Sequence, residues 1–79
     1  MERPRWLVTG ANRGIGRELV RQLEARGAAV VAVVRNPDSL AAAPGRAVIA
    51  CDVADPAAVA RLVAAIGDGA LDVVVNNAG

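Results

Sequence analysis

Three glycines, Gly10, Gly14 and Gly16, lie between a short apolar run and a helical pattern near the start of this 79-residue chain. The run, residues 6–8, is typical of a buried strand, and residues 15–24 carry apolar side chains at helical spacing. Glycine lets a phosphate approach bare backbone, and the unpaired N–H groups at a helix start attract anions. The junction predicts a phosphate-binding loop, although three glycines could also form a simple turn. Its spacing is neither G-x-G-x-x-G nor that of a Walker loop.

Apolar runs recur along the chain after this junction. Residues 28–34 and 47–51 form two further runs rich in valine and alanine, and residues 71–75 form a fourth. Short and uniformly apolar runs are typical of strands that are covered on both faces, as in a parallel sheet. An Ala/Pro-rich segment, residues 38–45, precedes the third run and could hold a helical turn.

Two amphipathic helical patterns separate these runs. The first ends before Gly27, and the second begins with Asp55 as its N-cap and Pro56 at the first helical position. The expected apolar faces comprise Ile15, Leu19, Val20 and Leu23 in the first helix and Val59, Leu62, Val63 and Ile66 in the second. Strands and helices that alternate at these lengths predict βαβ units with right-handed crossovers, the front half of a doubly wound α/β sheet.

The residue types that are missing exclude several classes of site. The chain has no histidine, tyrosine or lysine, so all nine basic residues are arginine, and Thr9 and Ser39 carry its only hydroxyl groups. A Ser-His-Asp triad, a histidine metal site and a Schiff-base lysine are therefore excluded, and we expect no catalytic residue and no metal site in this chain. The arginines form no basic stripe, which argues against a nucleic-acid partner.

The single cysteine and the amino terminus bear on where the protein resides. Cys51 cannot pair within the chain, so a reducing compartment such as the cytoplasm is expected, and we interpret this thiol as a small core residue. Residues 1–5 are mostly polar, and the apolar stretch that follows breaks at Gly10. We therefore expect neither a signal peptide nor a membrane span.

Three motifs together resemble one family. Residues 9–16, Thr-Gly-x-x-x-Gly-x-Gly, are similar to the cofactor loop of the compact short-chain dehydrogenases/reductases. Cys51-Asp52-Val53 resembles the family's adenine-contacting Asp-hydrophobic pair, and Asn76-Asn77-Ala78-Gly79 resembles its signature after the fourth strand. The resemblance covers the whole chain, and it implies that residues 1–79 form part of a Rossmann-type dinucleotide-binding domain, truncated after about four parallel strands.

The resemblance also implies residue roles. Gly10, Asn12, Arg13 and Ile15 are expected to line the phosphates and the adenosine ribose. Asp52 and Val53 would contact the adenine, and Asn76 with the backbone through Gly79 would contact the ribose and hold the fourth strand. The predicted cofactor-binding residues are Gly10, Asn12, Arg13, Gly14, Ile15, Gly16, Arg35, Asp52, Val53, Asn76, Ala78 and Gly79.

The residue after the second predicted strand indicates which dinucleotide is bound. NAD enzymes commonly place a carboxylate there for the ribose 2′-OH, whereas this chain has Arg35. A guanidinium can hold a 2′-phosphate through paired, charge-assisted hydrogen bonds, and the resemblance places Arg13 near the same phosphate. We therefore predict NADP(H), with NAD less favoured. The alternative is that both arginines are solvated surface residues.

The catalytic residues that the resemblance implies are absent from these 79 residues. In the family, a serine and a Tyr-x-x-x-Lys motif beyond the fourth strand support hydride transfer, and this chain has neither tyrosine nor lysine. We expect an inactive front portion of an NADP-dependent oxidoreductase that interconverts a carbonyl and an alcohol and whose parent is a homo-oligomer. The alternative is a stand-alone nucleotide-binding module with a regulatory or redox-sensing role. Because the fourth strand would expose apolar surface at an edge, we expect the isolated chain to be unstable or to associate.

Overall fold

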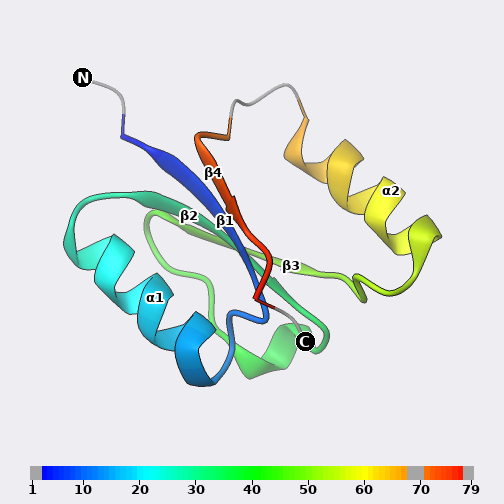
Figure 1. Ribbon diagram of the computed structural model, residues 1–79, viewed down its shortest axis with the longest axis horizontal. Coiled ribbons are helices and arrows are strands. Elements are labelled where there is room, and N and C mark those ends of the chain that lie inside the picture. The colour runs from blue at the N-terminus through cyan, green and yellow to red at the C-terminus, as the bar shows by residue number, and fades with distance from the viewer. Residues whose placement is uncertain (1–2, 68–70, 78–79) are drawn as a thin grey trace.

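A computed structural model of the chain describes residues 3–67 and 71–77 and shows one sheet between two helices (Figure 1). The elements are β1 (Arg5–Thr9), α1 (Gly14–Ala25), β2 (Ala29–Val34), the 3-10 turn η1 (Pro37–Ser39), β3 (Arg46–Ala50), α2 (Pro56–Ile66) and β4 (Val73–Val75). Four parallel strands are ordered β3-β2-β1-β4. The predicted α/β architecture with a parallel sheet is confirmed.

The two helices cover opposite faces of the sheet (Figure 1). Successive side chains of a strand point to opposite faces, so β1 sends Val8 toward α1 and Leu7 toward α2. Val20 and Leu23 of α1 are buried in the first cluster, and Ala58 and Leu62 of α2 are buried in the second. Residues 30–34 of β2 are all at most 3% exposed. This explains why its sequence shows an unbroken apolar run rather than alternation.

The strand order determines where the loops after the strands lie. From β1 the chain passes to β2 and β3 on one side, and it then returns to add β4 on the other side of β1. Because the strands are parallel, the segments that follow all four carboxyl ends meet at one edge of the sheet. The gap between β1 and β4 is a topological switch point, where open α/β sheets bind their ligands.

The fourth strand is shorter than the run of apolar residues that predicted it. We expected residues 71–75, but the regular ladder begins at Val73, which pairs with Trp6. Before it, Asp72 contacts Arg5 in two ways. Its carboxylate Oδ2 accepts a hydrogen bond from the backbone N–H of Arg5 at 2.7 Å, and its own N–H donates to the Arg5 carbonyl at 2.8 Å. A side chain therefore occupies a position in the ladder that the partner carbonyl would otherwise fill.

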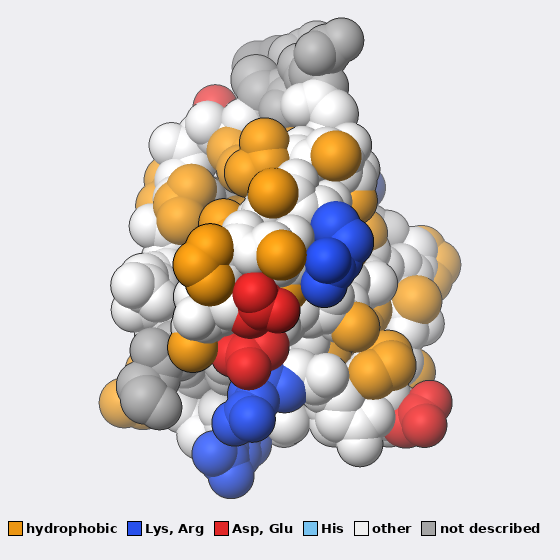
Figure 2. Space-filling view, turned by 90° about the vertical axis from the view of Figure 1, so that its right-hand side faces the viewer, with side chains coloured by type: hydrophobic (Ala, Val, Ile, Leu, Met, Phe, Trp, Pro, Cys, Tyr) orange, Lys and Arg blue, Asp and Glu red, His pale blue; other side chains and the backbone are white. Residues whose placement is uncertain are grey.

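Two apolar side chains expected in the core are exposed, so these assignments were wrong. Ile15 is 81% exposed, because Gly16 instead of Ile15 faces Gly10 and Asn77 at the first turn of α1. Val63 is 63% exposed, since the side of α2 that contacts the sheet is centred on Ala58 and Leu62. The face of the molecule that carries α2 displays several hydrophobic side chains at its surface (Figure 2).

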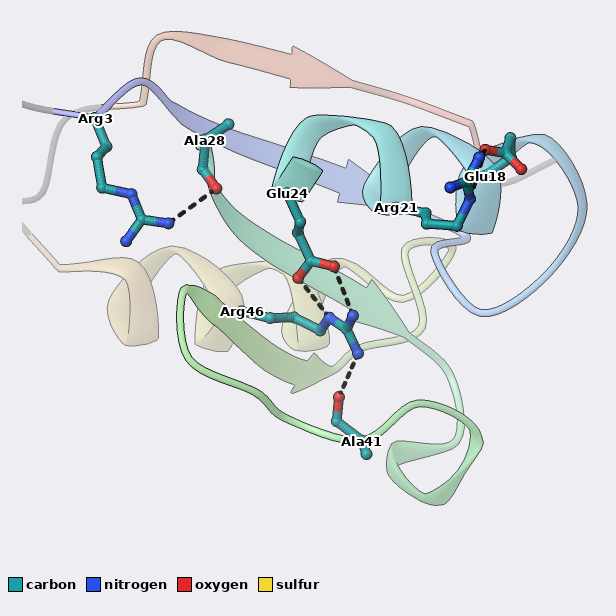
Figure 3. A network of polar contacts seen from close by, with 7 residues as sticks. All are labelled: Arg3, Glu18, Arg21, Glu24, Ala28, Ala41 and Arg46. Carbon is teal, nitrogen blue, oxygen red and sulfur yellow. Dashed lines mark hydrogen bonds and ion pairs between the residues drawn. The ribbon is translucent and has the colours of Figure 1, made fainter. Parts of the chain in front are cut away.

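The connection between β2 and β3 is fixed by polar contacts and one buried anchor. The helical turn expected within residues 38–45 forms slightly earlier, as η1, and Leu40 after it is 3% exposed. Arg46 at the start of β3 donates two hydrogen bonds to the carboxylate of Glu24 at 2.8 and 2.6 Å, and a third to the carbonyl of Ala41 at 2.9 Å (Figure 3). This guanidinium ties the connection to the carboxyl end of α1.

The only aromatic side chain lies near the opposite edge of the sheet from the strands' carboxyl ends. Trp6 of β1 pairs with Val30 on one side and Val73 on the other, and its half-buried ring packs against the cluster beneath α1. Trp6 is therefore a packing residue at the start of β1.

Candidate functional site

A cavity of about 610 Å³ opens at the carboxyl edge of the sheet. Segments that follow all four strands contribute to it, and this size is typical of ligand pockets. The residues that line it are Gly10, Asn12, Arg13, Gly14, Val33, Arg35, Asn36, Cys51, Val53 and Asn77. We call this cavity the cleft.

The glycine loop forms one wall of the cleft. Gly10 and Gly14 have φ angles of 62° and 59°, in the left-handed region that favours glycine. At Gly16 the need is space, because an added Cβ would lie 2.2 Å from the carbonyl oxygen of Gly10 and 2.5 Å from the side-chain nitrogen of Asn77. The loop is tied to β2, since the N–H of Ala11 donates to the carbonyl of Val33 at 3.4 Å. Helix α1 can therefore start close to the ends of β1 and β4.

The start of α1 offers backbone N–H groups to the cleft. Its N-cap, Arg13, has an extended backbone (φ −160°, ψ 164°), and no side chain caps the helix. The first helical bond runs from the N–H of Arg17 to the carbonyl of Arg13 at 3.3 Å. Among the described residues, the N–H groups of residues 14–16 have no backbone acceptor. Unpaired N–H groups at the positive end of a helix dipole favour an anionic ligand.

The two asparagines after β4 connect it to β1 across the switch point. The hydroxyl of Thr9 accepts from the N–H of Asn77 at 2.9 Å and lies 3.2 Å from the side-chain oxygen of Asn76, to which it donates. The side-chain nitrogen of Asn77 donates to the carbonyl of Gly10 at 3.3 Å. Asn77 therefore lines the cleft and also holds the glycine loop, while the carboxamide of Asn76 engages Thr9.

The segment after β3 forms the wall of the cleft opposite the glycine loop. Val53 is 38% exposed and lines the cleft, and so does Cys51, which is buried in the cluster beneath α2. The interpretation of Cys51 as a core residue is confirmed. Asp52 is exposed but does not line the cleft, and one of its carboxylate oxygens accepts from the N–H of Ala54 at 3.0 Å. Val53 and Cys51 give this part of the cleft an apolar lining, against which an aromatic ring can pack.

Two exposed arginines border the cleft without a protein partner. Arg13 comes from the glycine loop and Arg35 from the end of β2, and within the described residues neither side chain forms an ion pair or hydrogen bond. None of the described residues that line the cleft is Asp or Glu. The cleft therefore presents positive charge with nothing in the described chain to neutralise it.

Two arginines away from the cleft are paired with carboxylates. Arg46 binds Glu24, and Arg21 binds Glu18 on the exposed side of α1 (Figure 3). The hydrogen bonds from Arg46 hold the pKa of Glu24 below its ordinary value, and those from Arg21 lower the pKa of Glu18. Arg5, Arg17, Arg26 and Arg61 also form no ion pair among the described residues, so what distinguishes Arg13 and Arg35 is their position at the cleft.

The structure brings half of the predicted cofactor residues to the cleft. Those that line it are Gly10, Asn12, Arg13, Gly14, Arg35 and Val53. Those that adjoin it without lining it are Ile15, Gly16, Asp52 and Asn76. Ala78 and Gly79 lie outside the described residues, so their assignment stays a prediction.

Four lining residues were not in the predicted list, namely Val33, Asn36, Cys51 and Asn77, although the backbone of Asn77 lies in the segment that was expected to contact the ribose. Asn77 is adjacent to a predicted residue, and the sequence alone does not show which of two neighbouring asparagines turns inward. Asn36 follows Arg35 directly, and its position at the end of β2 is the signal that could have found it.

Among the described residues, no helix has the length and apolar character needed to cross a membrane.

Comparisons with known proteins agree with this geometry. A family model described as short chain dehydrogenase matches residues 5–79. The chain is 45% identical over 78 residues to L-xylulose reductase from Bos taurus, covering 94% of this chain and 31% of that protein. It is 41% identical over 78 residues to carbonyl reductase [NADPH] 2 from Sus scrofa, with the same coverage.

Solved structures share the fold. A short-chain dehydrogenase from Streptomyces avermitilis superposes with a TM-score of 0.90 at 35% identity, covering 99% of this chain and 31% of that one. Menthone neomenthol reductase from Mentha piperita gives 0.86 at 34% identity, covering 100% and 32%. The chain thus spans about a third of the length of these proteins.

Proposed function

This chain belongs to the short-chain dehydrogenase/reductase family, and on that premise we propose that it holds NADP(H) for the interconversion of a carbonyl and an alcohol. Two similar proteins are named as reductases, and the name of one specifies NADPH. Because those proteins are about three times as long, the activity of a whole protein that contains this chain is part of the proposal.

The observation that carries the choice of NADP(H) is the position of two arginines at the cleft, neither of which has a side-chain partner among the described residues. Arg13 and Arg35 reach the cleft from different elements, and no carboxylate of the described chain lines it. A 2′-phosphate would supply a negative charge to pair with both guanidinium groups, through short charge-assisted hydrogen bonds. The ribose of NAD has no such charge, and it is commonly held by an Asp or Glu, which this cleft does not offer.

The remaining parts of the cleft fit the rest of the dinucleotide. The free N–H groups of residues 14–16 suit the pyrophosphate, and the surface between Val53 and Cys51 suits the adenine. When bound, the nicotinamide supplies or accepts the hydride. The chain's own part is to bind and orient the cofactor, because it contains no tyrosine and no lysine to move a proton at the reacting carbonyl. We propose that residues 1–79 alone do not catalyse.

Titration calorimetry with NADPH and NADH tests the proposal in the intact protein that contains this sequence. We expect NADPH to bind about 100-fold more tightly, since hydrogen bonds between charged groups contribute about 1.5–3 kcal/mol each. Arg35→Ala should weaken NADPH binding about tenfold or more and leave NADH binding unchanged. Arg61→Ala, which removes an exposed arginine of α2 away from the cleft, is the matched control.

Two results would contradict this assignment. Equal affinities for NADPH and NADH would show that the arginines do not act on a 2′-phosphate. An Arg35→Ala variant that loses both cofactors equally would show a structural role instead. The activity itself is tested by following NADPH oxidation with aldehydes, ketones and ketoses as substrates, and no turnover with any carbonyl would oppose the proposed reaction.

A further inference from the structure

A second cavity lies at the edge of the sheet opposite the cleft, where β1, β2 and β3 begin. It measures about 320 Å³, and pockets for small ligands range upward from about 300 Å³. We call it the amino-edge cavity. None of the residues that line it lines the cleft. Those that carry the argument are Arg5, Ala29, Val31, Gly45, Arg46 and Ala47.

The amino-edge cavity opens on the face of the sheet that α2 covers. Leu7 and Val31 pack in the cluster beneath α2. Side chains two residues apart on one strand point to the same face, so the side chains of Arg5 and Ala29 point there as well. Ala47 pairs with Val31 in the sheet and shares its face. Because Ala29 and Ala47 carry only methyl groups, this end of the face is left hollow.

Arg5 supplies the charge of the amino-edge cavity. It is half-buried, and among the described residues its guanidinium forms no ion pair and no hydrogen bond. Its backbone is engaged, because the carboxylate of Asp72 accepts from the N–H of Arg5 at 2.7 Å. Asp72 thus holds the backbone of Arg5 and, within the described chain, leaves its guanidinium to a ligand.

Two other arginines near this edge are already bonded (Figure 3). Arg46 donates to the carboxylate of Glu24 at 2.8 and 2.6 Å. Arg3 donates to the carbonyls of Gly27 and Ala28 at 2.8 and 3.3 Å. Of the two guanidinium groups that line the amino-edge cavity, the one without a partner in the described chain therefore belongs to the first residue of β1.

The backbone around the cavity has little left to donate. The N–H of Val30 donates to the carbonyl of Gly45 at 2.8 Å, and the N–H of Arg46 donates to the carbonyl of Ala43 at 2.8 Å. A phosphate group is held best by several donors, whereas a single guanidinium matches the two oxygens of a carboxylate. The cavity therefore fits an anion with one carboxylate and an apolar body.

We propose that the amino-edge cavity binds a small organic monocarboxylate, with its carboxylate on the guanidinium of Arg5 and its apolar part against Ala29 and Ala47. The inference goes beyond the proposed function, which concerns the opposite edge of the sheet. Arg5 and Gly10 lie five residues apart along β1, which is about 17 Å in an extended strand. The monocarboxylate and NADP(H) can therefore be bound at the same time.

The test compares benzoate with benzamide, a neutral molecule of nearly the same shape, in the intact protein that contains this sequence. Ligand-observed NMR titration measures both affinities. We expect a dissociation constant for benzoate on the order of 1 mM, as for a compact ligand in a small pocket. Benzamide should bind at least about tenfold more weakly, because the charge-assisted hydrogen bonds to Arg5 are lost.

Two variants, each with a matched control, locate the site. Arg5→Gln should lower the affinity for benzoate about tenfold, whereas Arg26→Gln, which removes an exposed arginine just after α1, should leave it unchanged. Ala47→Leu fills the cavity and should lower the affinity for both probes about tenfold or more. Ala50→Leu adds the same side chain at an exposed position of β3 outside the cavity and should have no effect.

Four results would overturn the inference. Absence of benzoate binding up to about 20 mM would show that the intact protein has no such site. Equal affinities for benzoate and benzamide would show that the cavity does not select a carboxylate. Benzoate binding that survives both Arg5→Gln and Ala47→Leu would place the ligand elsewhere. Displacement of benzoate by NADPH would place it in the cleft. Loss of benzoate binding with unchanged NADPH binding in the two variants supports the inference and leaves the proposed function untouched.

Discussion

The two helices both start at the carboxyl edge of the sheet, yet their first turns differ. In α2, the carboxylate of Asp55 accepts a hydrogen bond from the N–H of Ala57 at 3.0 Å, and Pro56 removes an N–H that would otherwise be unpaired. In α1, the N-cap is Arg13, no side chain caps the helix, and its first turn has no acidic residue. Within the described residues, the start of α2 is thus satisfied by the chain itself, and the start of α1 is not.

The arrangement at α1 is unfavourable for the stability of the chain alone. Replacing a good N-cap by a poor one costs about 1 kcal/mol, and a cation near a helix N-terminus opposes the helix dipole by a further 0.3–1 kcal/mol or so. Both features become favourable when an anion binds between Arg13 and the free N–H groups. The contrast supports the proposal that the uncapped start of α1 binds an anion, whereas the start of α2 is capped by its own residues.

The largest effect on the free energy of unfolding is expected from a substitution at the position where a helix approaches the sheet. Gly16 and Ala58 each occupy the third position of a helix and face the sheet. In Gly16→Ala, the new Cβ would lie 2.2 Å from the carbonyl oxygen of Gly10, so we expect a loss of about 3 kcal/mol in the free energy of unfolding. Ala58→Gly should cost only about 1 kcal/mol. Chemical denaturation measures both, and equal costs would show that α1 does not need its close approach.

A capped α1 would test the opposite functions of the two helix starts directly. Arg13→Asp gives α1 an N-cap like that of α2, so we expect a gain of about 1 kcal/mol in stability. NADPH affinity should fall about 100-fold, because a guanidinium is lost and the new carboxylate repels phosphate. Denaturation and calorimetry on the same samples measure the two effects. A variant that keeps its NADPH affinity would show that the start of α1 is not an anion site.

The matching change in α2 should affect stability alone. Asp55→Ala removes the cap and should lower the free energy of unfolding by about 1 kcal/mol. Since Asp55 does not line the cleft, NADPH affinity should be unchanged in calorimetry at a temperature where the variant is folded. A change in affinity comparable to that of Arg13→Asp would remove the distinction between the two helices.

The smallest effect on stability is expected at the carboxyl end of α1, where Glu24 pairs with Arg46. The pKa of this carboxyl group is held below its ordinary value of 4.5 by the hydrogen bonds from Arg46. The stabilisation is therefore complete above pH 4.5 and is lost as the pH falls through the lowered pKa. Glu24→Gln should cost under about 1 kcal/mol at neutral pH.

The pH dependence of unfolding checks this assignment. The difference between the unaltered chain and Glu24→Gln should be present at neutral pH and should shrink toward zero as the pH falls through the lowered pKa of Glu24. Glu18→Gln, which breaks the exposed pair with Arg21, should show a smaller difference throughout. A difference for Glu24→Gln that persists unchanged at low pH would mean that the carboxylate charge is not its source.

Much of the fold was predictable because local signals and tertiary environment agree. The unbroken apolar run of β2 reflects burial on both faces, and Asp55 with Pro56 marks the start of α2 where the structure has it. Ile15 was misplaced because helical spacing alone puts it on the core side. The close contact that requires Gly16 turns Ile15 outward, and that contact involves Asn77, which follows β4 and is far away in sequence.

The candidate site was predictable only in part, for reasons of the same kind. The glycine loop, Arg35 and Val53 carry motifs that can be identified without coordinates. The orientation of Asn36 and Asn77 depends on their hydrogen-bond partners. The side-chain oxygen of Asn36 accepts from the N–H of Asp38, and the side-chain nitrogen of Asn77 donates to the carbonyl of Gly10. No pattern of neighbouring residues indicates which end of a carboxamide faces a cleft.

The position of Trp6 gives this chain a built-in optical reporter. No other aromatic side chain is present, so ultraviolet emission excited at long wavelength arises from one ring on β1, beside both β2 and β4. Emission from Trp6 should therefore follow the assembly of the central strands without any label. At about 3.3 Å per residue, the ring lies roughly 13 Å along the strand from Gly10, close enough for energy transfer to a reduced nicotinamide. Folding and cofactor occupancy can thus be observed in a single fluorescence experiment.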